Sequence, residues 1–318
     1  PDAPLWQRWQ GMRQAVRQLR RTTSFDLVAA HFALYTFPVL DLVRDLPLVV
    51  HFHGPWAWEG REEAKGGLQV AVKTWLERTV YRRGARCIVL SEAFGRELVQ
   101  RYGVAPERVR VVPGGVEANR FALTCSRREA REVLGWPTDR PIVLSVRRLV
   151  RRMGLERLIE AMVEVRRQVP EVLLLIAGRG SLADALQAQI DALGLAQHVR
   201  LLGFVPDDQL PLAYRAADLT VVPTVALEGF GLITLESLAA GTPVLVTPVG
   251  GLPEAVRGLS EALVLEDATP EALAAGLTEA LTGRRPLPSD ETCRAYVRVH
   301  YDWPVIARRV KAVYEEVL

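Results

Sequence analysis

Apolar and polar positions along the chain follow two alternating patterns. Short, almost continuous runs of Val, Ile and Leu are separated by longer segments in which apolar residues recur every three or four positions. The runs are typical of strands buried on both faces, and the longer segments are typical of amphipathic helices. Their alternation predicts parallel sheets covered by helices, which is an α/β fold.

The predicted elements form two series, divided by the sequence Val-Pro-Gly-Gly-Val at 112–116, whose Pro and Gly residues suit a domain connection. Strands are expected at 25–31, 46–53, 85–90 and 109–112 in the first series, and at 141–146, 172–177, 199–203, 218–222, 243–247 and 262–265 in the second. Helices are expected at 4–21, 38–44, 73–83, 92–102, 270–282, 289–300 and 303–318.

This arrangement predicts two Rossmann-like domains. The first, at 1–112, has only about four strands and is expected to be incomplete. The second, at 113–302, is expected to be a complete six-stranded domain, and the last helix, at 303–318, closes the chain. The helix at 4–21 has an apolar stripe that must cover another part of the protein.

Composition places the chain among ordinary globular proteins. It has 318 residues, of which 49% are hydrophobic and 24% charged, and no apolar run reaches the 18 residues of a membrane-spanning helix. The N-terminus lacks the pattern of a signal peptide. Three widely separated cysteines favour neither a disulfide framework nor a zinc site, so a reducing, cytoplasmic location is expected.

Positive charge is concentrated in the first third of the chain. Residues 1–112 hold 17 Lys and Arg against 11 Asp and Glu, although the whole chain has a net charge of only +3. A basic surface of this kind suits the inner face of an anionic membrane or an acidic acceptor, while solvated helix faces are the simpler explanation. Only three residues are lysines, so a phosphate site here would have to depend on Arg.

The clearest candidate for a binding site is the segment from Glu228 to Glu236, in which two carboxylates flank a Gly-Phe-Gly turn and an apolar run. If Gly231 or Leu232 opens a helix, its free backbone N–H groups can bind an anion such as a diphosphate. The alternative is a Gly-rich helix entry with two solvated glutamates.

Four arginines follow the first strand of the second series, within six positions: Arg147, Arg148, Arg151 and Arg152. Paired guanidinium groups at the end of a strand suit the two phosphates of a nucleotide sugar. Nucleic-acid backbone is the alternative, but no aromatic residues for base stacking are interleaved with them.

Other chemistry is less well supported. His51 and His53 share one face of a strand end, yet no third metal ligand or nucleophile motif stands near them in the sequence. Gly178-Arg-Gly180 follows a strand but lacks the third glycine of a dinucleotide-binding loop, and no Walker-type phosphate loop is present.

Taken together, the motifs resemble the retaining, metal-independent glycosyltransferases of the GT-B fold, which include mannosyl- and glucosyltransferases and sucrose synthases. The resemblance covers residues 26–318 and is strongest over 141–256, and it implies that the last helix, 303–318, crosses back to the first domain. The matching segments are His53-Gly54, Val112–Val116, Arg148-Leu149, Leu175–Gly178, Leu202–Val205, Glu228–Glu236, Gly241–Val244 and Gly250–Glu254.

The resemblance implies catalytic roles for three residues. Glu228 would contact hydroxyls of the donor sugar, Arg148 would neutralise charge on the leaving nucleoside diphosphate, and His53 would reach the sugar from the first domain.

It also implies a set of donor-binding residues. Glu236 would hold the ribose, Val205 would lie near the base, and backbone amides at the helix start would bind the diphosphate. The latter come from Gly229, Phe230, Gly231 and Leu232.

The chain departs from the family pattern at two positions of the Arg-rich segment. Arg147 stands where a glycine is common, and Met153 stands where a phosphate-binding lysine is usual. A thioether cannot neutralise a diphosphate, so we expect Arg147 or Arg152 to replace that charge. The first domain also lacks the family's opening strand and Gly-rich loop, which predicts self-association or a partner at an exposed sheet edge.

The function expected from this resemblance is transfer of a sugar from a UDP- or GDP-sugar to an unknown saccharide, lipid or small-molecule acceptor, without a metal or other cofactor and without nucleic acid. A catalytically impaired nucleotide-sugar-binding or scaffold protein is the main alternative. A GT-B epimerase or phosphorylase fits less well, because no cofactor lysine for a phosphorylase is identifiable.

Overall fold

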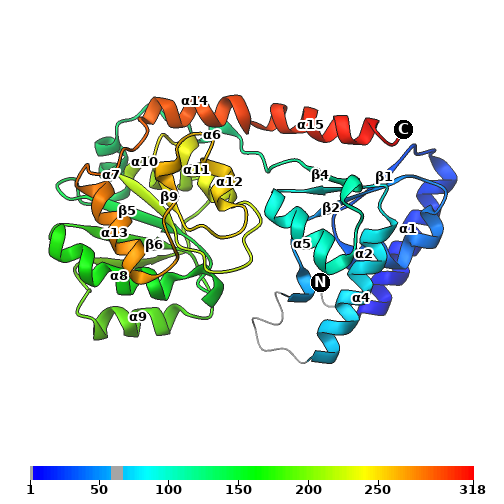
Figure 1. The fold of residues 1–318 in the computed structure, drawn as a ribbon, viewed down its shortest axis with the longest axis horizontal. Helices are drawn as coiled ribbons and strands as arrows, with labels where there is room; N and C mark the ends of the chain where they lie inside the picture. The colour runs from blue at the N-terminus through cyan, green and yellow to red at the C-terminus, as the bar shows by residue number, and fades with distance from the viewer. Residues whose placement is uncertain (1–2, 59–66) are drawn as a thin grey trace. The chain divides into compact units, whose positions relative to one another are not determined.

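The structure is a computed structural model that describes residues 3–58 and 67–318. The chain divides into two compact units (Figure 1). The first unit contains Pro1–Pro113 together with Ala307–Leu318, and the second contains Gly114–Ile306.

The first unit is built on a parallel four-stranded sheet of order β1-β2-β3-β4. All four predicted strands are confirmed, although each is shorter than predicted: β1 Val28–Ala30, β2 Leu48–Phe52, β3 Arg86–Val89 and β4 Val109–Val111. The helices described in this unit are α1 Leu5–Thr22, α2 Ala33–Thr36, η1 Phe37–Val43, α4 Gly67–Arg83, α5 Glu92–Tyr102 and η2 Pro106–Arg108.

A cluster of aromatic rings fills the core of the first unit. Phe52 of β2 meets Tyr81, Phe94 and Tyr102 edge-on, with ring centroids 5.3 to 5.9 Å apart. The β2 residues Leu48, Val49, Val50 and Phe52 are almost completely buried, as expected of an inner strand with helices on both faces. The Val-rich pattern of this strand therefore sets the centre of the sheet.

The apolar stripe of the N-terminal helix α1 covers part of the first unit, as predicted, where Trp9 packs against the core. None of its residues is fully buried, and its apolar stripe makes only partial contacts, such as Trp9 with Phe37 at 6.0 Å between ring centroids. Arg13 and Arg20, seven positions apart on one face, instead form ion pairs with Asp41 and Asp45 of the η1 region. Polar contacts thus contribute much of the attachment of α1.

The second unit has a parallel five-stranded sheet of order β7-β6-β5-β8-β9. Its strands are β5 Ile142–Val146, β6 Leu173–Ala177, β7 Val199–Gly203, β8 Leu219–Val222 and β9 Val244–Val246. The order runs outward from β5 in both directions, so the chain switches direction between β5 and β8. In open α/β sheets, ligands bind at the carboxyl ends of the strands beside such a switch point.

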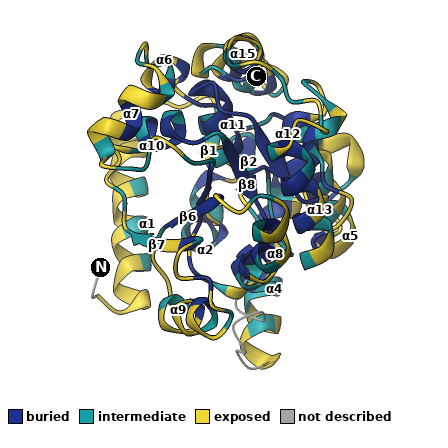
Figure 2. Ribbon diagram, turned by 90° about the vertical axis from the view of Figure 1, so that its left-hand side faces the viewer, coloured by how far each residue is buried: buried dark blue, intermediate teal, exposed yellow. Residues whose placement is uncertain are grey.

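Helices cover both faces of this sheet. Every residue of β6 and β8 is buried, whereas outer helices such as α9 expose most of their residues (Figure 2). The helices of this unit are α6 Ala118–Phe121, α7 Arg127–Leu134, η3 Arg151–Met153, α8 Leu155–Gln168, α9 Ala183–Ala192, α10 Leu210–Ala216, α11 Leu232–Ala239, α12 Leu252–Val256, η4 Glu261–Leu263, α13 Pro270–Leu281 and α14 Asp290–His300. The last helix, α15 Trp303–Glu315, begins in this unit and continues into the first, which contains Ala307–Leu318.

One predicted element was wrong in type. The sixth strand at 262–265 is replaced by the 3-10 helix η4, and only a single bridge between Val246 and Val264 continues the sheet. The Ser260 hydroxyl accepts a hydrogen bond from the Ala262 amide, which favours the helical turn over an extended chain. The short helix predicted at 38–44 is confirmed and is of the 3-10 type, η1.

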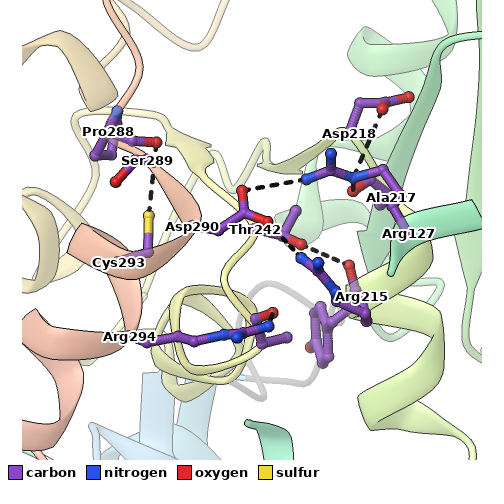
Figure 3. A network of polar contacts seen from close by, with 12 residues as sticks. Arg127, Arg215, Ala217, Asp218, Thr242, Pro288, Ser289, Asp290, Cys293 and Arg294 are labelled. Atoms are coloured by element: carbon purple, nitrogen blue, oxygen red, sulfur yellow. Dashed lines mark hydrogen bonds and ion pairs between the residues drawn. The ribbon is translucent and has the colours of Figure 1, made fainter. Parts of the chain in front are cut away.

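A polar network joins three helices on one flank of the second unit (Figure 3). Asp290, at the start of α14, forms ion pairs with Arg127 of α7 and Arg215 of α10. Arg127 also donates to the carbonyl of Ala217, 2.8 Å away. The network fixes α14 against the helices that lie beside the site described below.

No helix in the described part of the chain is long and apolar enough to cross a membrane.

Candidate functional site

Three loops of the second unit lie at the carboxyl ends of neighbouring strands. They comprise residues 147–154 after β5, 223–231 after β8 and 247–251 after β9. Because β5, β8 and β9 are parallel and adjacent, their carboxyl ends meet at one edge of the sheet, beside the switch point. The Arg-rich segment and the Glu228 segment, separate in the sequence, are therefore brought together.

The centre of this site is a buried ion pair between Arg147 and Glu228. Nη2 of Arg147 donates to a carboxylate oxygen of Glu228 and to the hydroxyl oxygen of Thr224. The two charged side chains are only 7% and 14% exposed, so water screens the pair weakly. The pair fixes the Glu228 carboxylate in one position before any ligand binds.

Two hydrogen bonds to main-chain carbonyls hold the first two loops against one another. Arg152 donates from Nη1 to the carbonyl of Leu227 at 3.0 Å, and the Val225 amide donates to the carbonyl of Arg152 at 2.9 Å. Leu227 has a φ of 53°, an unfavourable value for a residue with a branched side chain. Strain of this kind persists where the surroundings impose it and is frequent at functional sites.

The third loop holds the backbone of Glu228. The Gly251 amide donates to the carbonyl of Glu228 at 3.0 Å. A Cβ atom at Gly250 would lie 2.0 Å from the same carbonyl oxygen, so only glycine permits this approach. The Gly-Gly pair at 250–251 is therefore part of the site rather than a simple turn.

Helix α11 begins where the sequence predicts it. Gly231 caps the helix with a φ of 79°, and Leu232 is its first residue. A Cβ atom at Gly231 would lie 2.4 Å from the side chain of Leu252, so this position also requires glycine. Phe230 is buried and packs against Tyr301, with 5.7 Å between ring centroids. The preceding Gly229 is half-buried.

The second carboxylate of the segment, Glu236, lies on α11 and is half-buried. The hydroxyl of Tyr214, a buried residue of α10, donates to Oε2 of Glu236 at 2.9 Å. Desolvation raises the pKa of Glu236, and the Tyr214 hydrogen bond opposes that shift only in part. Glu228 and Glu236 therefore have different surroundings: the first contacts a cation, the second a neutral phenol.

The remaining predicted site residues occupy varied environments. Arg148 is exposed, and Val205, two residues beyond the end of β7, is half-buried. Met153, which stands where a lysine was expected, is 5% exposed and belongs to the hydrophobic core of the second unit. A lysine side chain in this conformation would carry its ammonium into that core, which explains why an apolar residue fits here.

His53 lies in the first unit and has two histidine neighbours. Its ring lies nearly parallel to those of His51 and His31, with ring centroids 6.4 and 5.3 Å away. Nε2 of His53 lies 3.1 Å from Nδ1 of His31. His51 and His53 thus point together, as predicted, but His31 was missed. The signal in the sequence was that His31 is the last residue of the predicted strand at 25–31. The structure adds that Ala30 of β1 pairs with Val50, which precedes His51.

Next to His53 is a pocket of about 270 Å³ formed only by the first unit. Aromatic and polar groups share its lining: His31, Phe32, Tyr35, His53, Trp56, Glu77 and Tyr81. Glu77 is fully buried and accepts hydrogen bonds from two backbone amides and two tyrosine hydroxyls, at 2.9 to 3.2 Å. Its lone pairs are occupied, so Glu77 has a structural role in the pocket wall.

Within residues 3–58 and 67–318, no three or more His, Cys, Asp and Glu side chains are grouped so that they could hold a metal ion.

Family comparisons cover both units. Residues 126–300 match the family described as "Glycosyl transferases group 1", and residues 1–120 match "Glycosyltransferase Family 4". A D-inositol 3-phosphate glycosyltransferase of Thermobispora bispora is 34% identical over 307 residues, 92% of this chain and 71% of that protein. An uncharacterised glycosyltransferase of Methanocaldococcus jannaschii is 31% identical over 234 residues, covering 72% of this chain but only 59% of its own length.

Solved structures support the fold. The Anabaena protein HepE in complex with UDP has a TM-score of 0.80 at 21% identity, over 96% of this chain and 82% of that one. Sucrose-phosphate synthase from Thermosynechococcus elongatus has a TM-score of 0.77 at 23% identity, over 99% of this chain and 80% of that one. The two Rossmann-like units expected from the sequence are thus an arrangement that known proteins share.

Proposed function

Because this chain belongs to the group 1 glycosyl transferases, we propose that it transfers a sugar from a nucleoside-diphosphate sugar to an acceptor with retention of the anomeric configuration. The observation that carries this proposal is the buried Arg147–Glu228 pair at the switch point of the second unit. The pair places a fixed carboxylate beside a cluster of arginines, which suits a sugar joined to a diphosphate.

The donor would be held by the three loops and the start of α11. Amides at 229–232 are proposed to bind the diphosphate at the positive end of the helix. Glu236 is proposed to hold the ribose and Val205 to contact the base. UDP and GDP are both plausible: HepE was solved with UDP, and a Mycolicibacterium smegmatis relative, 34% identical over 181 residues, is described as a GDP-mannose-dependent mannosyltransferase.

Glu228, Arg148 and His53 are the proposed catalytic residues. Glu228 would accept hydrogen bonds from hydroxyls of the donor sugar. The exposed guanidinium of Arg148 would neutralise the charge that develops on the leaving diphosphate. His53 would contribute a hydrogen bond to the sugar.

The second positive charge for the diphosphate is proposed to come from Arg147 or Arg152, because the core position of Met153 provides none. Both arginines already contact the loop that carries Glu228. Each guanidinium has five N–H donors, so it can bind a phosphate oxygen through another N–H while it keeps this contact.

Retention is proposed to follow a front-face displacement. The bond from the anomeric carbon to the diphosphate oxygen breaks while the acceptor oxygen bonds to the same face of that carbon. The departing phosphate oxygen takes the acceptor proton, so neither an enzyme nucleophile nor a metal is required. Electrostatic stabilisation of the leaving group then provides most of the rate enhancement.

A second candidate is a protein that binds nucleotide sugars without turnover. The observation that favours it is the replacement of the expected lysine by a buried Met153. The chain also spans only 59% of the length of the Methanocaldococcus jannaschii relative and 71% of that of the Thermobispora bispora relative. The activity of those proteins is therefore only a proposal for this chain.

The test combines binding with turnover. UDP, GDP and their sugars are screened by thermal shift, because a ligand that binds the native state raises Tm. Release of UDP or GDP is then measured with and without EDTA. We expect release that is insensitive to EDTA and that falls at least about 100-fold in Glu228→Gln, which keeps a polar partner for Arg147.

The matched control is Glu279→Gln, which alters a surface ion pair with Arg285 and should release nucleotide at the wild-type rate. Binding without release supports the non-catalytic alternative. Neither binding nor release with any nucleotide sugar would reject both candidates.

A further inference from the structure

Three histidines form a stack at the carboxyl ends of β1 and β2. The His31 and His51 rings are 4.3 Å apart between centroids and inclined by 19°, and the His31 and His53 rings are 5.3 Å apart and inclined by 17°. Strand register explains the arrangement, because β1 and β2 are parallel neighbours. Ala30 pairs with Val50, so the residues that follow them, His31 and His51, lie side by side. The stack therefore depends on strand pairing and not on sequence proximity.

The hydrogen bond between His31 and His53 has a chemical consequence. At 3.1 Å, Nδ1 of His31 and Nε2 of His53 share one proton, so one ring donates and the other accepts. A histidine whose one nitrogen is engaged in this way has its tautomer set by that bond. Only Nδ1 of His53 is then left for a ligand.

The surroundings of His51 and His53 disfavour the charged form of each ring. The pKa of His51 is lowered to about 4, mainly by desolvation and then by the neighbouring imidazoles of His31 and His53. Nε2 of His51 lies 2.8 Å from the hydroxyl oxygen of Tyr314. Desolvation and His31 also lower the pKa of His53. A neutral His53 that accepts a hydrogen bond at Nε2 carries its own proton at Nδ1.

The backbone that carries His53 is anchored separately. Glu77 of α4 accepts hydrogen bonds from the amides of Trp56 and Ala57, at 3.1 and 3.2 Å. Glu77 thus fixes the loop, while the contact between Nε2 of His53 and Nδ1 of His31 orients the ring. The groups that face His53 are His31 after β1, His51 on β2, Phe32 and, across the pocket, Glu77.

We propose that His31 is a positioning residue: it donates its Nδ1–H to Nε2 of His53 and so holds His53 in the Nδ1–H tautomer, with that N–H as the donor for the substrate. The sugar-contacting role of His53 rests on the proposed function, whereas the tautomer does not. The two statements can therefore fail independently.

The first experiment reads the tautomer directly in the full chain, with ¹⁵N-labelled histidine and long-range ¹H–¹⁵N correlation spectra. We expect the Nδ1–H tautomer for His53 in the wild type and its loss in His31→Ala. His31→Asn, whose side-chain amide can donate from a similar position, should restore it. The same substitution at an exposed histidine outside the stack, His300→Asn, is the control and should leave the His53 signals unchanged.

The second experiment measures nucleotide release in the same variants. His31→Ala should lower kcat roughly 10- to 100-fold, the effect of a misplaced contact group, and His31→Asn should recover most of it. An Nε2–H tautomer in the wild type, or spectra and rates of His31→Ala that match the wild type, would overturn the positioning role. A tautomer that changes as expected in a protein with no turnover would uphold it and reject the proposed catalysis instead.

Discussion

Arg147 and Met153 are the two residues of the Arg-rich loop that differ from the expected family pattern. Arg147 stands where the family resemblance led us to expect glycine, yet it is 8% exposed and contacts Glu228. Met153 stands where a lysine was expected, and its side chain packs into the core. The positive charge of the site is thus carried by arginines whose side chains face the Glu228 loop.

The contribution of these arginines is tested by donor affinity. We expect Arg147→Ala and Arg152→Ala each to weaken UDP or GDP binding about tenfold or more, because a charge-assisted hydrogen bond to phosphate contributes about 1.5–3 kcal/mol. Isothermal titration calorimetry measures the affinity. Arg151→Ala, an exposed arginine of the same loop, is the matched control.

Unchanged affinity in both Arg147→Ala and Arg152→Ala would reject the idea that either replaces the lysine. Thermal unfolding without ligand is measured in parallel, because removal of Arg147 leaves the weakly exposed Glu228 without its cation.

At the scale of single elements, helix α4 determines the shape of the loop that follows β2. Its Glu77 is fully buried and receives four hydrogen bonds, two from the loop and two from Tyr81 and Tyr102 of the aromatic core. One carboxylate therefore links the core of the first unit to the wall of its pocket.

Glu77→Gln should destabilise the protein by about 1–3 kcal/mol, because the amide NH₂ cannot accept the backbone N–H that one carboxylate oxygen now accepts. Tm and chemical denaturation measure the loss. Desolvation raises the pKa of Glu77 in the folded protein. The stability of the wild type relative to Glu77→Gln is therefore largest below the unfolded pKa of about 4.3, and it falls as pH rises through the folded pKa.

The difference in stability between wild type and Glu77→Gln should therefore narrow as the pH is raised. A difference that widens with pH would contradict the assigned direction of the shift, and a variant as stable as the wild type at every pH would contradict the four-bond arrangement.

The attachment of helix α14 to α7 and α10 depends on the charge of its first residue, Asp290. Burial alone would raise the pKa of Asp290, but the hydrogen bond from Arg215 and the charge of Arg127 outweigh it and hold the pKa below its usual value. Asp290→Asn should cost roughly 1 kcal/mol, since Asp290 is 41% exposed and partly screened.

The stability that Asp290 contributes is present above its unfolded pKa of about 3.9 and is lost as pH falls through the lowered folded value. Wild type and Asp290→Asn should accordingly differ at pH 7 and converge below pH 3, as followed by urea denaturation. Equal stability at pH 7 would contradict a net contribution from the network in Figure 3.

At the scale of the whole molecule, each unit has its own sheet and core, and the chain enters the first unit twice. Residues 307–318 return to it, where Glu316 pairs with Arg86 and Arg110 and Tyr314 contacts His51. Both ends of the chain thus stabilise the first unit, although only four strands are described in its sheet.

Strand β1 is an edge of that sheet, and its neighbours Phe25 and Phe32 are 40% and 65% exposed. Edge strands with unpaired backbone groups promote association, so we predict a concentration-dependent dimer in light scattering. Ala29→Lys, on β1, should shift the protein to monomer, whereas Val111→Lys, on the opposite edge strand β4, should not.

A monomer at every concentration would reject the prediction. A dimer that Val111→Lys disrupts and Ala29→Lys leaves intact would assign the interface to the other edge.

Local sequence patterns determined most of the elements. Apolar runs predicted the nine observed strands, with bounds correct to within a few residues. The glycines before Leu232 predicted the start of α11. These predictions succeed because periodicity, capping and turn residues act over short distances. The same locality explains the errors. The segment 262–265 has a strand-like composition, but the cap at Ser260 and the limited pairing at Val246 made it a 3-10 turn.

Only the tertiary structure decided which distant residues meet. The strand order places Arg147 against Glu228, 81 positions apart, and the pairing of β1 with β2 places His31 against His53. Neither contact follows from spacing along the chain, because sheet order and register are set by the packing of whole elements. The sequence alone could identify the carboxylates and arginines of the site and two of its three histidines, whereas the fold added His31 and selected the partners of the others.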